Sequence, residues 1–189
     1  MACVELGHVQ EMLRRLLSSG RSAPRLARRM ESLLSAAASV QRSICDALTS
    51  LVVAAQQESA GVLPYEVDGN KNAYRMDDAN VPSLLSLPLL GFLSAEHPVY
   101  RATRQFALSS RNPYYFNGSA GQGVGSPHGK GYNYTWPIGI VVRAMTSNSD
   151  EEIQYCLDMV SITRTRIMYV CMYTLNIFGT TIYFSVAGS

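Results

Sequence analysis

Carboxylates and aromatic side chains gather between residues 65 and 80 of the chain. The carboxylates lie beside phenol and amide side chains, in the set Tyr65, Glu66, Asp68, Tyr74, Asp77, Asp78 and Asn80. Aromatic rings pack on the C–H faces of a neutral sugar, and carboxylates and amides hydrogen-bond its hydroxyl groups. This pattern is consistent with a sugar-binding loop, to which the fold would bring Trp136. Composition alone favours a structural interpretation, in which Asp78 and Asn80 cap a helix and the other charges are solvated.

A glycine-rich segment lies further along the chain, at residues 121–130. Clustered glycines let backbone N–H groups approach a phosphate. The spacing excludes a P-loop, however, because Val124 stands where that motif needs glycine and Gly131 stands where it needs serine or threonine. We expect tight turns that bring His128 and nearby aromatic residues to the wall of a pocket. A plain flexible loop is the alternative.

Neither metal nor nucleic-acid chemistry is indicated. The three histidines are dispersed along the chain, so we expect no metal site and no cofactor. Free thiols are expected for the four cysteines, which are widely scattered and include no Cys-x-x-Cys pair: Cys3, Cys45, Cys156 and Cys171. The net charge of +2 gives no electrostatic reason for a nucleic-acid or anionic membrane partner.

Length, composition and periodicity predict one packed, all-α domain. The 189 residues are 47% hydrophobic and 16% charged, which excludes a disordered chain. Apolar residues recur every three or four positions in residues 1–17 and 24–51, and Gly20 separates the two segments, so a helical hairpin is expected.

Shorter helices are expected in the second half of the chain. Residues 98–108 and 137–145 each carry a helical pattern, and Arg104 is placed on the outward face of the first. Ser149 and Glu152 form a capping box for another helix. Residues 81–90 suggest a short helix or two helical turns, bracketed by prolines and ended by a glycine. No strand pattern of useful length precedes Arg166, and residues 112–134 are expected to be irregular.

Residues 167–189 contain no charged residue. Their length is sufficient to cross a bilayer, but Asn176 and Gly179 dilute the apolar character. Membrane contact through this segment and a β-rich, aggregation-prone tail both remain open. At the other end no signal peptide is visible, and the compartment is unknown.

Two segments match the acceptor pattern for N-linked glycosylation. They are Asn117-Gly-Ser119 and Asn133-Tyr-Thr135. Without a visible signal peptide the pattern carries little weight.

Several ordered blocks between residues 65 and 160 resemble a known enzyme family. The blocks are Tyr65-Glu-Val-Asp-Gly69, Met76-Asp-Asp-Ala-Asn-Val-Pro-Ser-Leu-Leu-Ser-Leu-Pro88, Ser110-Arg-Asn-Pro-Tyr-Tyr-Phe116, Gly123-Val-Gly-Ser-Pro-His128, Trp136-Pro137, Thr146-Ser147 and Glu151-Glu152-Ile153. They are similar to the family 125 glycoside hydrolases, which are metal-independent exo-α-1,6-mannosidases with an (α/α)6 barrel. The first helix also resembles a helix of that family.

The resemblance implies a fold, a partner and a set of contact residues. Residues 1–160 would form a partial (α/α)6 barrel, about half of the toroid, built from helical hairpins. Residues 161–189 would be a non-family tail, of the kind that a frameshift or intron read-through produces. The partner would be an α-mannoside glycan. The candidates for substrate contact lie in the matching blocks: Asp68, Asp77, Asp78, Asn80, His128 and Trp136.

The resemblance also implies a departure from the family chemistry. Inverting hydrolysis needs one carboxylic acid to protonate the leaving oxygen and one carboxylate to activate water. By the resemblance, the acid belongs to a Ser-Asp-Asp segment ahead of Met1 and the base to a His-Glu-Ser segment after Val160. No Asp or Glu follows Asp158.

We therefore expect a chain truncated at its N-terminus, with no catalytic residue assigned and no activity of its own. A non-catalytic mannoside-binding or interaction module is the alternative function. A third hypothesis is an enzyme that uses other carboxylates, such as Asp77 or Asp78, although nothing in the sequence places either at a scissile bond.

Overall fold

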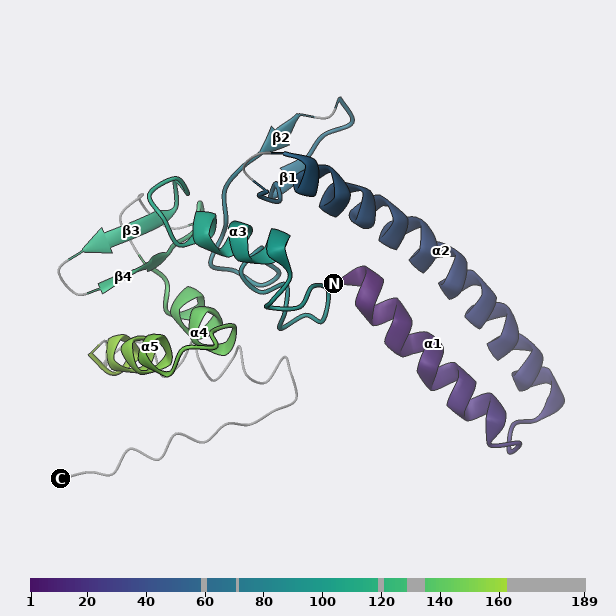
Figure 1. Ribbon diagram of the computed structural model, residues 1–189. Helices are drawn as coiled ribbons and strands as arrows, with labels where there is room; N and C mark the ends of the chain where they lie inside the picture. Colours follow the sequence, from purple (N-terminus) through teal and green to yellow (C-terminus); the bar gives the residue numbers. More distant parts are fainter. Residues whose placement is uncertain (59–60, 71, 119–120, 129–134, 163–189) are drawn as a thin grey trace, which may run out of the picture. The chain divides into compact units, whose positions relative to one another are not determined.

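The computed structural model describes residues 1–58, 61–70, 72–118, 121–128 and 135–162 (Figure 1). These residues are mostly helical with a few short strands. They divide into two compact units: residues 1–63 with 87–103, and residues 64–86 with the chain from 104 onward. Within the described ranges no helix is both long and apolar enough to cross a membrane. The uncharged segment 167–189 lies outside them.

A long helical hairpin dominates the first unit. Helix α1 (Ala2–Ser18) and helix α2 (Pro24–Gln57) lie side by side and run in opposite directions (Figure 1). Gly20 separates them with a φ of 65°, which is the left-handed conformation that glycine adopts without steric cost. Pro24 begins α2, where its missing N–H costs no helical hydrogen bond. The predicted hairpin is confirmed.

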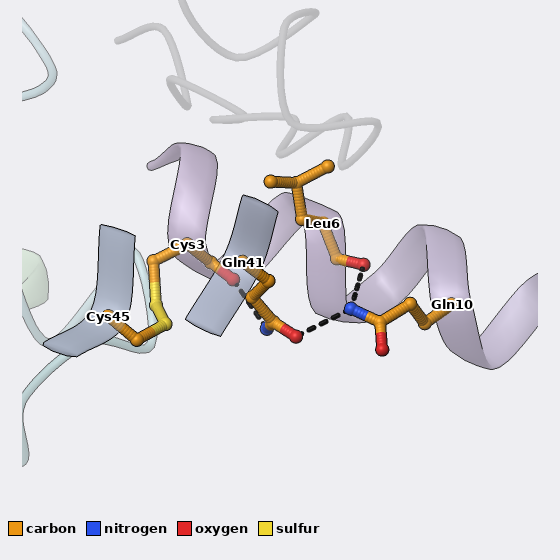
Figure 2. Close-up of a disulfide and its surroundings, with 5 residues drawn as sticks. All are labelled: Cys3, Leu6, Gln10, Gln41 and Cys45. Atoms are coloured by element: carbon orange, nitrogen blue, oxygen red, sulfur yellow. Dashed lines mark hydrogen bonds between the residues drawn. A yellow bond between two sulfur atoms is a disulfide. The ribbon is translucent and has the colours of Figure 1, made fainter. Parts of the chain in front are cut away.

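A disulfide joins the two helices, and the expectation of free thiols is wrong for this pair. Cys3 of α1 is bonded to Cys45 of α2, with their Cα atoms 5.6 Å apart (Figure 2). Cysteine spacing gave no sign of the pairing, because it depends on how the antiparallel helices align. Cys156 is free and buried, as expected. Cys171 lies beyond the described residues.

Glutamine side chains form a second link across the hairpin. The Nε2 of Gln41 in α2 donates to the backbone carbonyl of Cys3 at 2.7 Å. The Nε2 of Gln10 in α1 donates to Oε1 of Gln41 at 2.5 Å and to the carbonyl of Leu6 at 3.1 Å (Figure 2). Gln10 is 4% exposed, so these bonds satisfy an amide that would otherwise be costly to bury.

Residues 81–91 form bends and turns instead of the expected short helix. The peptide between Val81 and Pro82 is cis. Pro88 has no N–H to donate to a helix. Gly91 closes the last turn by donating its N–H to the carbonyl of Pro88 at 3.0 Å, with a φ of 70°.

Helix α3 (Pro98–Ala107) confirms the helix predicted at 98–108. Thr103 is fully buried within it. Its hydroxyl donates to the carbonyl of Val99 at 2.7 Å and accepts the N–H of Leu63 at 3.0 Å. A buried backbone N–H from the chain after α2 is thereby satisfied.

The second unit contains two antiparallel β-hairpins, which corrects the purely helical expectation. Strand β1 (Glu66–Val67) pairs with β2 (Ala73–Tyr74). Strand β3 (Tyr115–Gly118) pairs with β4 (Gly121–Val124), with Tyr115 opposite Val124 (Figure 1). Strands of two to four residues are too short to show an alternating pattern, and the glycines of β4 carry no side chain to alternate.

Helices α4 (Pro137–Met145) and α5 (Asp150–Ile162) pack together in the same unit (Figure 1). Ile140, Cys156 and Met159 form the buried cluster between them. At the start of α5 the hydroxyl of Ser149 accepts the N–H of Glu152 at 3.2 Å, which confirms half of the predicted capping box. The Glu152 carboxylate does not return to Ser149, because three other groups bind it.

These groups make Glu152 the centre of an ion-pair network. Its Oε1 accepts from Nε of Arg143 at 2.7 Å, and its Oε2 accepts from Nη2 of Arg104 at 2.8 Å and from the hydroxyl of Ser147 at 2.5 Å. Arg104 is only 20% exposed, so its predicted outward position is wrong. Burial alone would raise the pKa of Glu152, but hydrogen bonds from Ser147, Arg143 and Arg104 outweigh it and lower the pKa to about 2.

Replacing Glu152 by glutamine should lower the free energy of unfolding by about 2 to 3 kcal/mol, because two largely buried guanidinium groups lose their counter-charge. Urea denaturation at pH 7 measures the change. Glu151→Gln is the matched control, because Glu151 is in the same helical turn but is exposed and accepts from the hydroxyl of Ser149 instead of from arginine, and a much smaller change is expected there. Equal losses in the two variants would contradict the role given to the network.

Candidate functional site

Asp77 is an interior anchor for the loop that carries the candidate site. Its side chain is fully buried, and its two carboxylate oxygens accept the backbone N–H groups of Leu84 at 2.8 Å and Leu85 at 3.0 Å. Burial raises its pKa to about 7, although these N–H groups pull it downward. Both oxygens are occupied by backbone groups, so Asp77 positions the loop and does not face a ligand.

Asn112 holds the same loop through the backbone of Asp77, and it was not among the predicted site residues. Its Oδ1 accepts the N–H of Asp77 at 3.1 Å and the N–H of Tyr114 at 3.2 Å. Its Nδ2 donates to the carbonyl of Ala107 at 3.0 Å. Asn112 is 1% exposed. The only sequence signal for it was its position inside the family-like block Ser110–Phe116.

Asp78, Asn80, Ser126 and His128 come together on two loops. The Oδ1 of Asp78 accepts the backbone N–H of Asn80 at 2.9 Å and its Nδ2 at 3.0 Å. The same Nδ2 donates to the hydroxyl of Ser126 at 3.1 Å, and that hydroxyl accepts the N–H of His128 at 3.2 Å. Ser126 was not among the predicted residues, although it lies in the same block as His128.

One oxygen of this cluster is oriented toward a ligand-accessible side chain. The Oδ2 of Asp78 lies 4.0 Å from Nε2 of His128. The His128 side chain is 76% exposed, whereas that of Asp78 is 3% exposed. A buried carboxylate held by Asn80 therefore lies beside an exposed imidazole ring. Both groups can form hydrogen bonds with the hydroxyl groups of a ligand.

Backbone contacts hold the two loops together. Ala79 donates its N–H to the carbonyl of Gly125 at 2.8 Å, and Gly125 donates to the carbonyl of Tyr114 at 2.7 Å. Gly139 of α4 packs directly on this junction, because a Cβ there would stand 2.9 Å from the carbonyl oxygen of Val124 and 3.1 Å from the Cβ of Ala79. Only glycine allows helix and loop to approach so closely.

Tyr65 and Trp136 border the loops. Burial raises the pKa of the Tyr65 phenol, and the negative charges of Asp78 and Asp77 raise it further, which places this ring within electrostatic reach of the cluster. Trp136 is the N-cap of α4 and is partly buried, and its backbone N–H donates to the carbonyl of Val124 at 3.0 Å. The backbone thus brings Trp136 next to Gly125.

Asp68 has a different role from the other candidates. It closes the turn between β1 and β2, where its carboxylate accepts the N–H groups of Asn70 and Asn72, each at 2.8 Å. The side-chain Nδ2 of Asn72 donates to the other carboxylate oxygen at 2.7 Å and lowers the pKa of Asp68 most, and the two backbone bonds lower it further. The structure therefore does not join Asp68 to Asp78 by any described contact.

A shallow hollow lies on the β1–β2 hairpin and is lined by Glu66, Val67, Asp68, Asn72, Ala73 and Tyr74. Its strand residues are exposed, and it is open to solvent. The Asp78 cluster is the better candidate site, because a buried carboxylate held by a hydrogen-bond network is costly without a function or a fixed structural role. Among the residues that the structure describes, no group of three His, Cys, Asp or Glu side chains could hold a metal ion.

Comparisons with known proteins match this chain along most of its length. A family model described as metal-independent alpha-mannosidase (GH125) matches residues 1–178. The Meiotically up-regulated gene 157 protein of Schizosaccharomyces pombe is 52% identical over 99 residues. That match covers 52% of this chain and 19% of the relative.

A solved structure is also similar. It is a metal-independent alpha mannosidase from Streptococcus pneumoniae in a non-productive substrate complex with alpha-1,6-mannobiose. The TM-score is 0.71 with 36% sequence identity, over 84% of this chain and 35% of that chain. The chain therefore spans about a third of the solved protein and about a fifth of the curated relative. The similarity agrees with the mostly helical architecture and indicates an α/α-type fold.

Proposed function

Because the chain belongs to the metal-independent alpha-mannosidase family GH125, we propose that it binds α-1,6-linked mannosides through the loops that carry Asp78, Asn80 and His128. Trp136 lines the same site and provides an aromatic face for the sugar ring. Asp77 holds the loop from inside. Asp68 stabilises the turn between β1 and β2 and is not proposed to contact the sugar. The solved neighbour was obtained with alpha-1,6-mannobiose, which supports this choice of ligand.

The observation that carries the proposal is the carboxylate of Asp78. One of its oxygens is saturated by Asn80, while the other lies beside the exposed imidazole of His128. A sugar hydroxyl that hydrogen-bonds to that oxygen would meet a carboxylate already fixed in place by Asn80. A preorganised acceptor of this kind favours binding of a polyol.

Turnover is not part of the proposal. Residues 1–160 are proposed to form about half of an (α/α)6 barrel, and no residue of this chain is assigned as the acid or the base of inverting hydrolysis. Asp77 is unsuited to replace either group, because both of its oxygens accept backbone hydrogen bonds.

Titration with α-1,6-mannobiose, followed by NMR or calorimetry, tests the binding function. Asp78→Asn should weaken binding about tenfold or more, because it removes a charge-assisted acceptor worth about 1.5 to 3 kcal/mol while keeping the shape of the side chain. Asp68→Asn is the matched control and should leave the affinity unchanged. Equal affinities of the wild type and Asp78→Asn would remove Asp78 from the site.

Two further measurements separate the alternatives. Loss of binding in Trp136→Ala would locate the site at the start of α4. Release of mannose during a long incubation, persisting in the presence of a chelator, would favour an enzyme with other carboxylates. No binding by a folded wild-type chain would favour an interaction module instead.

A further inference from the structure

We propose that Asn117 carries an N-linked oligosaccharide. This asparagine opens the acceptor pattern Asn117-Gly-Ser119, which the mannoside site does not use. The pattern by itself is weak, because short motifs of this kind occur by chance. Two observations on the folded chain strengthen it: the oxidised cysteine pair in α1 and α2, and the position of Asn117 in β3.

The disulfide points to the compartment in which the modification occurs. Disulfides form and persist in oxidising environments such as the lumen of the endoplasmic reticulum, and they are rare where thiols are kept reduced. Cys3 and Cys45 are bonded across the hairpin. The lumen that oxidises such a pair is also where oligosaccharides are transferred to asparagine. The disulfide therefore supplies the evidence on compartment that the N-terminal sequence did not.

The position of Asn117 is suited to carry a bulky group. It is the last but one residue of β3 and pairs with Gln122 of β4, close to the hairpin turn. Asn117 and Gly118 are exposed, whereas the two preceding residues of the strand are partly buried. An attached sugar at Asn117 therefore displaces no packed side chain. Ser119 supplies the hydroxyl residue of the pattern, and both Ser119 and Asn133 of the second pattern lie outside the described residues.

The transfer is a substitution at the anomeric carbon of a lipid-linked oligosaccharyl diphosphate. The Nδ2 of Asn117 forms a bond to that carbon and loses one proton to a base of the transferase. The bond from the anomeric carbon to the diphosphate oxygen breaks, and the lipid diphosphate leaves with the electron pair. No oxidant or reductant takes part.

Peptide mapping of the natural protein, isolated from its own cells, tests the proposal. Trypsin separates the two acceptor patterns, because Arg111, Lys130 and Arg143 are its cleavage sites around them. The peptide 112–130 contains Asn117, and the peptide 131–143 contains Asn133. We expect 112–130 to appear only after enzymatic deglycosylation, with residue 117 converted to aspartate. Recovery of all of this peptide unmodified, without that treatment, would overturn the proposal.

The same digest tests the premise about the compartment. Without reduction, the peptide with Cys3 should be linked to the peptide 43–71, which contains Cys45. An intact disulfide with unmodified Asn117 would overturn the glycosylation itself. Free thiols together with unmodified Asn117 would overturn both the premise and the proposal.

Variants provide an independent readout in the cells that make the protein. Asn117→Gln should abolish the shift in electrophoretic mobility that deglycosylation causes. Ser119→Ala should do the same, because it breaks the pattern without touching the asparagine. Asn133→Gln is the matched control and should retain the Asn117-dependent shift. A shift that survives in Asn117→Gln and Ser119→Ala would also overturn the proposal.

Discussion

Replacing Cys3 and Cys45 by serine is expected to lower the stability of the α1–α2 hairpin by about 4 kcal/mol. The two cysteines are 42 residues apart in the sequence. In the chain-entropy description, a cross-link over that separation removes about this much conformational free energy from the unfolded state. The Gln10–Gln41 bond remains in the variant, so the hairpin should still form, but it should open far more often.

Hydrogen exchange of the α1 amides measures this change directly, because it reports local opening. We expect protection to fall about a thousandfold in the double serine variant. Reductant should have the same effect on the wild type and no further effect on the variant. Unchanged protection in the reduced wild type would show that helix packing alone holds α1 on α2.

The second large effect concerns Asp77 and pH. Its pKa is raised from 3.8 in the unfolded chain to about 7 in the folded one, mainly by burial. The folded protein therefore binds this proton more tightly, and the free energy of unfolding falls as pH rises through that window. Ionisation of Asp77 lowers the free energy of unfolding by about 4 kcal/mol between pH values below 3.8 and pH values above about 7, since each pKa unit corresponds to about 1.4 kcal/mol.

Other carboxylates change stability in the opposite direction, so the measurement must isolate Asp77. The lowered pKa of Glu152 gives stability that is present above its unfolded value of 4.5 and is lost as pH falls toward 2.

The Asp77→Asn variant has no ionisable group at this position. It should be less stable than the wild type at pH 4, because one hydrogen of the new side-chain amide faces a backbone N–H.

As pH rises from about 4 to about 7, we expect the wild type to lose stability through ionisation of Asp77. Asp77→Asn does not ionise, so its stability relative to the wild type should rise over the same range. Urea denaturation at a series of pH values checks this. Asp68→Asn, on the exposed hairpin turn, serves as the control for a general charge effect. Parallel curves for Asp77→Asn and the wild type would mean that Asp77 does not titrate in this range.

Sequence patterns predicted the helices well and the cross-links poorly. Local signals are sufficient for α1 and α2, because apolar periodicity, Gly20 and Pro24 act within a few residues. The disulfide and the β3–β4 hairpin depend on contacts between segments. The alignment of two antiparallel helices decides which cysteines meet, and a four-residue strand containing glycines has no pattern to read.

The candidate site was predictable in composition but not in orientation. Asp78, Asn80 and His128 were identified from the family-like blocks, and the structure brings them together with Ser126. Asp77 and Asp78 are adjacent and chemically identical, yet the first anchors the interior and the second lies beside a surface histidine. Neighbouring residues in non-helical backbone point in different directions, and sequence does not reveal which one points inward.

The Asn80–Ser126 hydrogen bond also has a consequence for the order of folding. These residues are 46 positions apart, whereas α1 and α2 are joined by a turn of five residues. Contacts between near neighbours form sooner, because less chain entropy is lost when the loop closes. During synthesis the α1–α2 hairpin can close while Asp78 is still solvated. A ribosome that pauses before residue 126 would therefore present a completed hairpin and a candidate site that has not yet assembled.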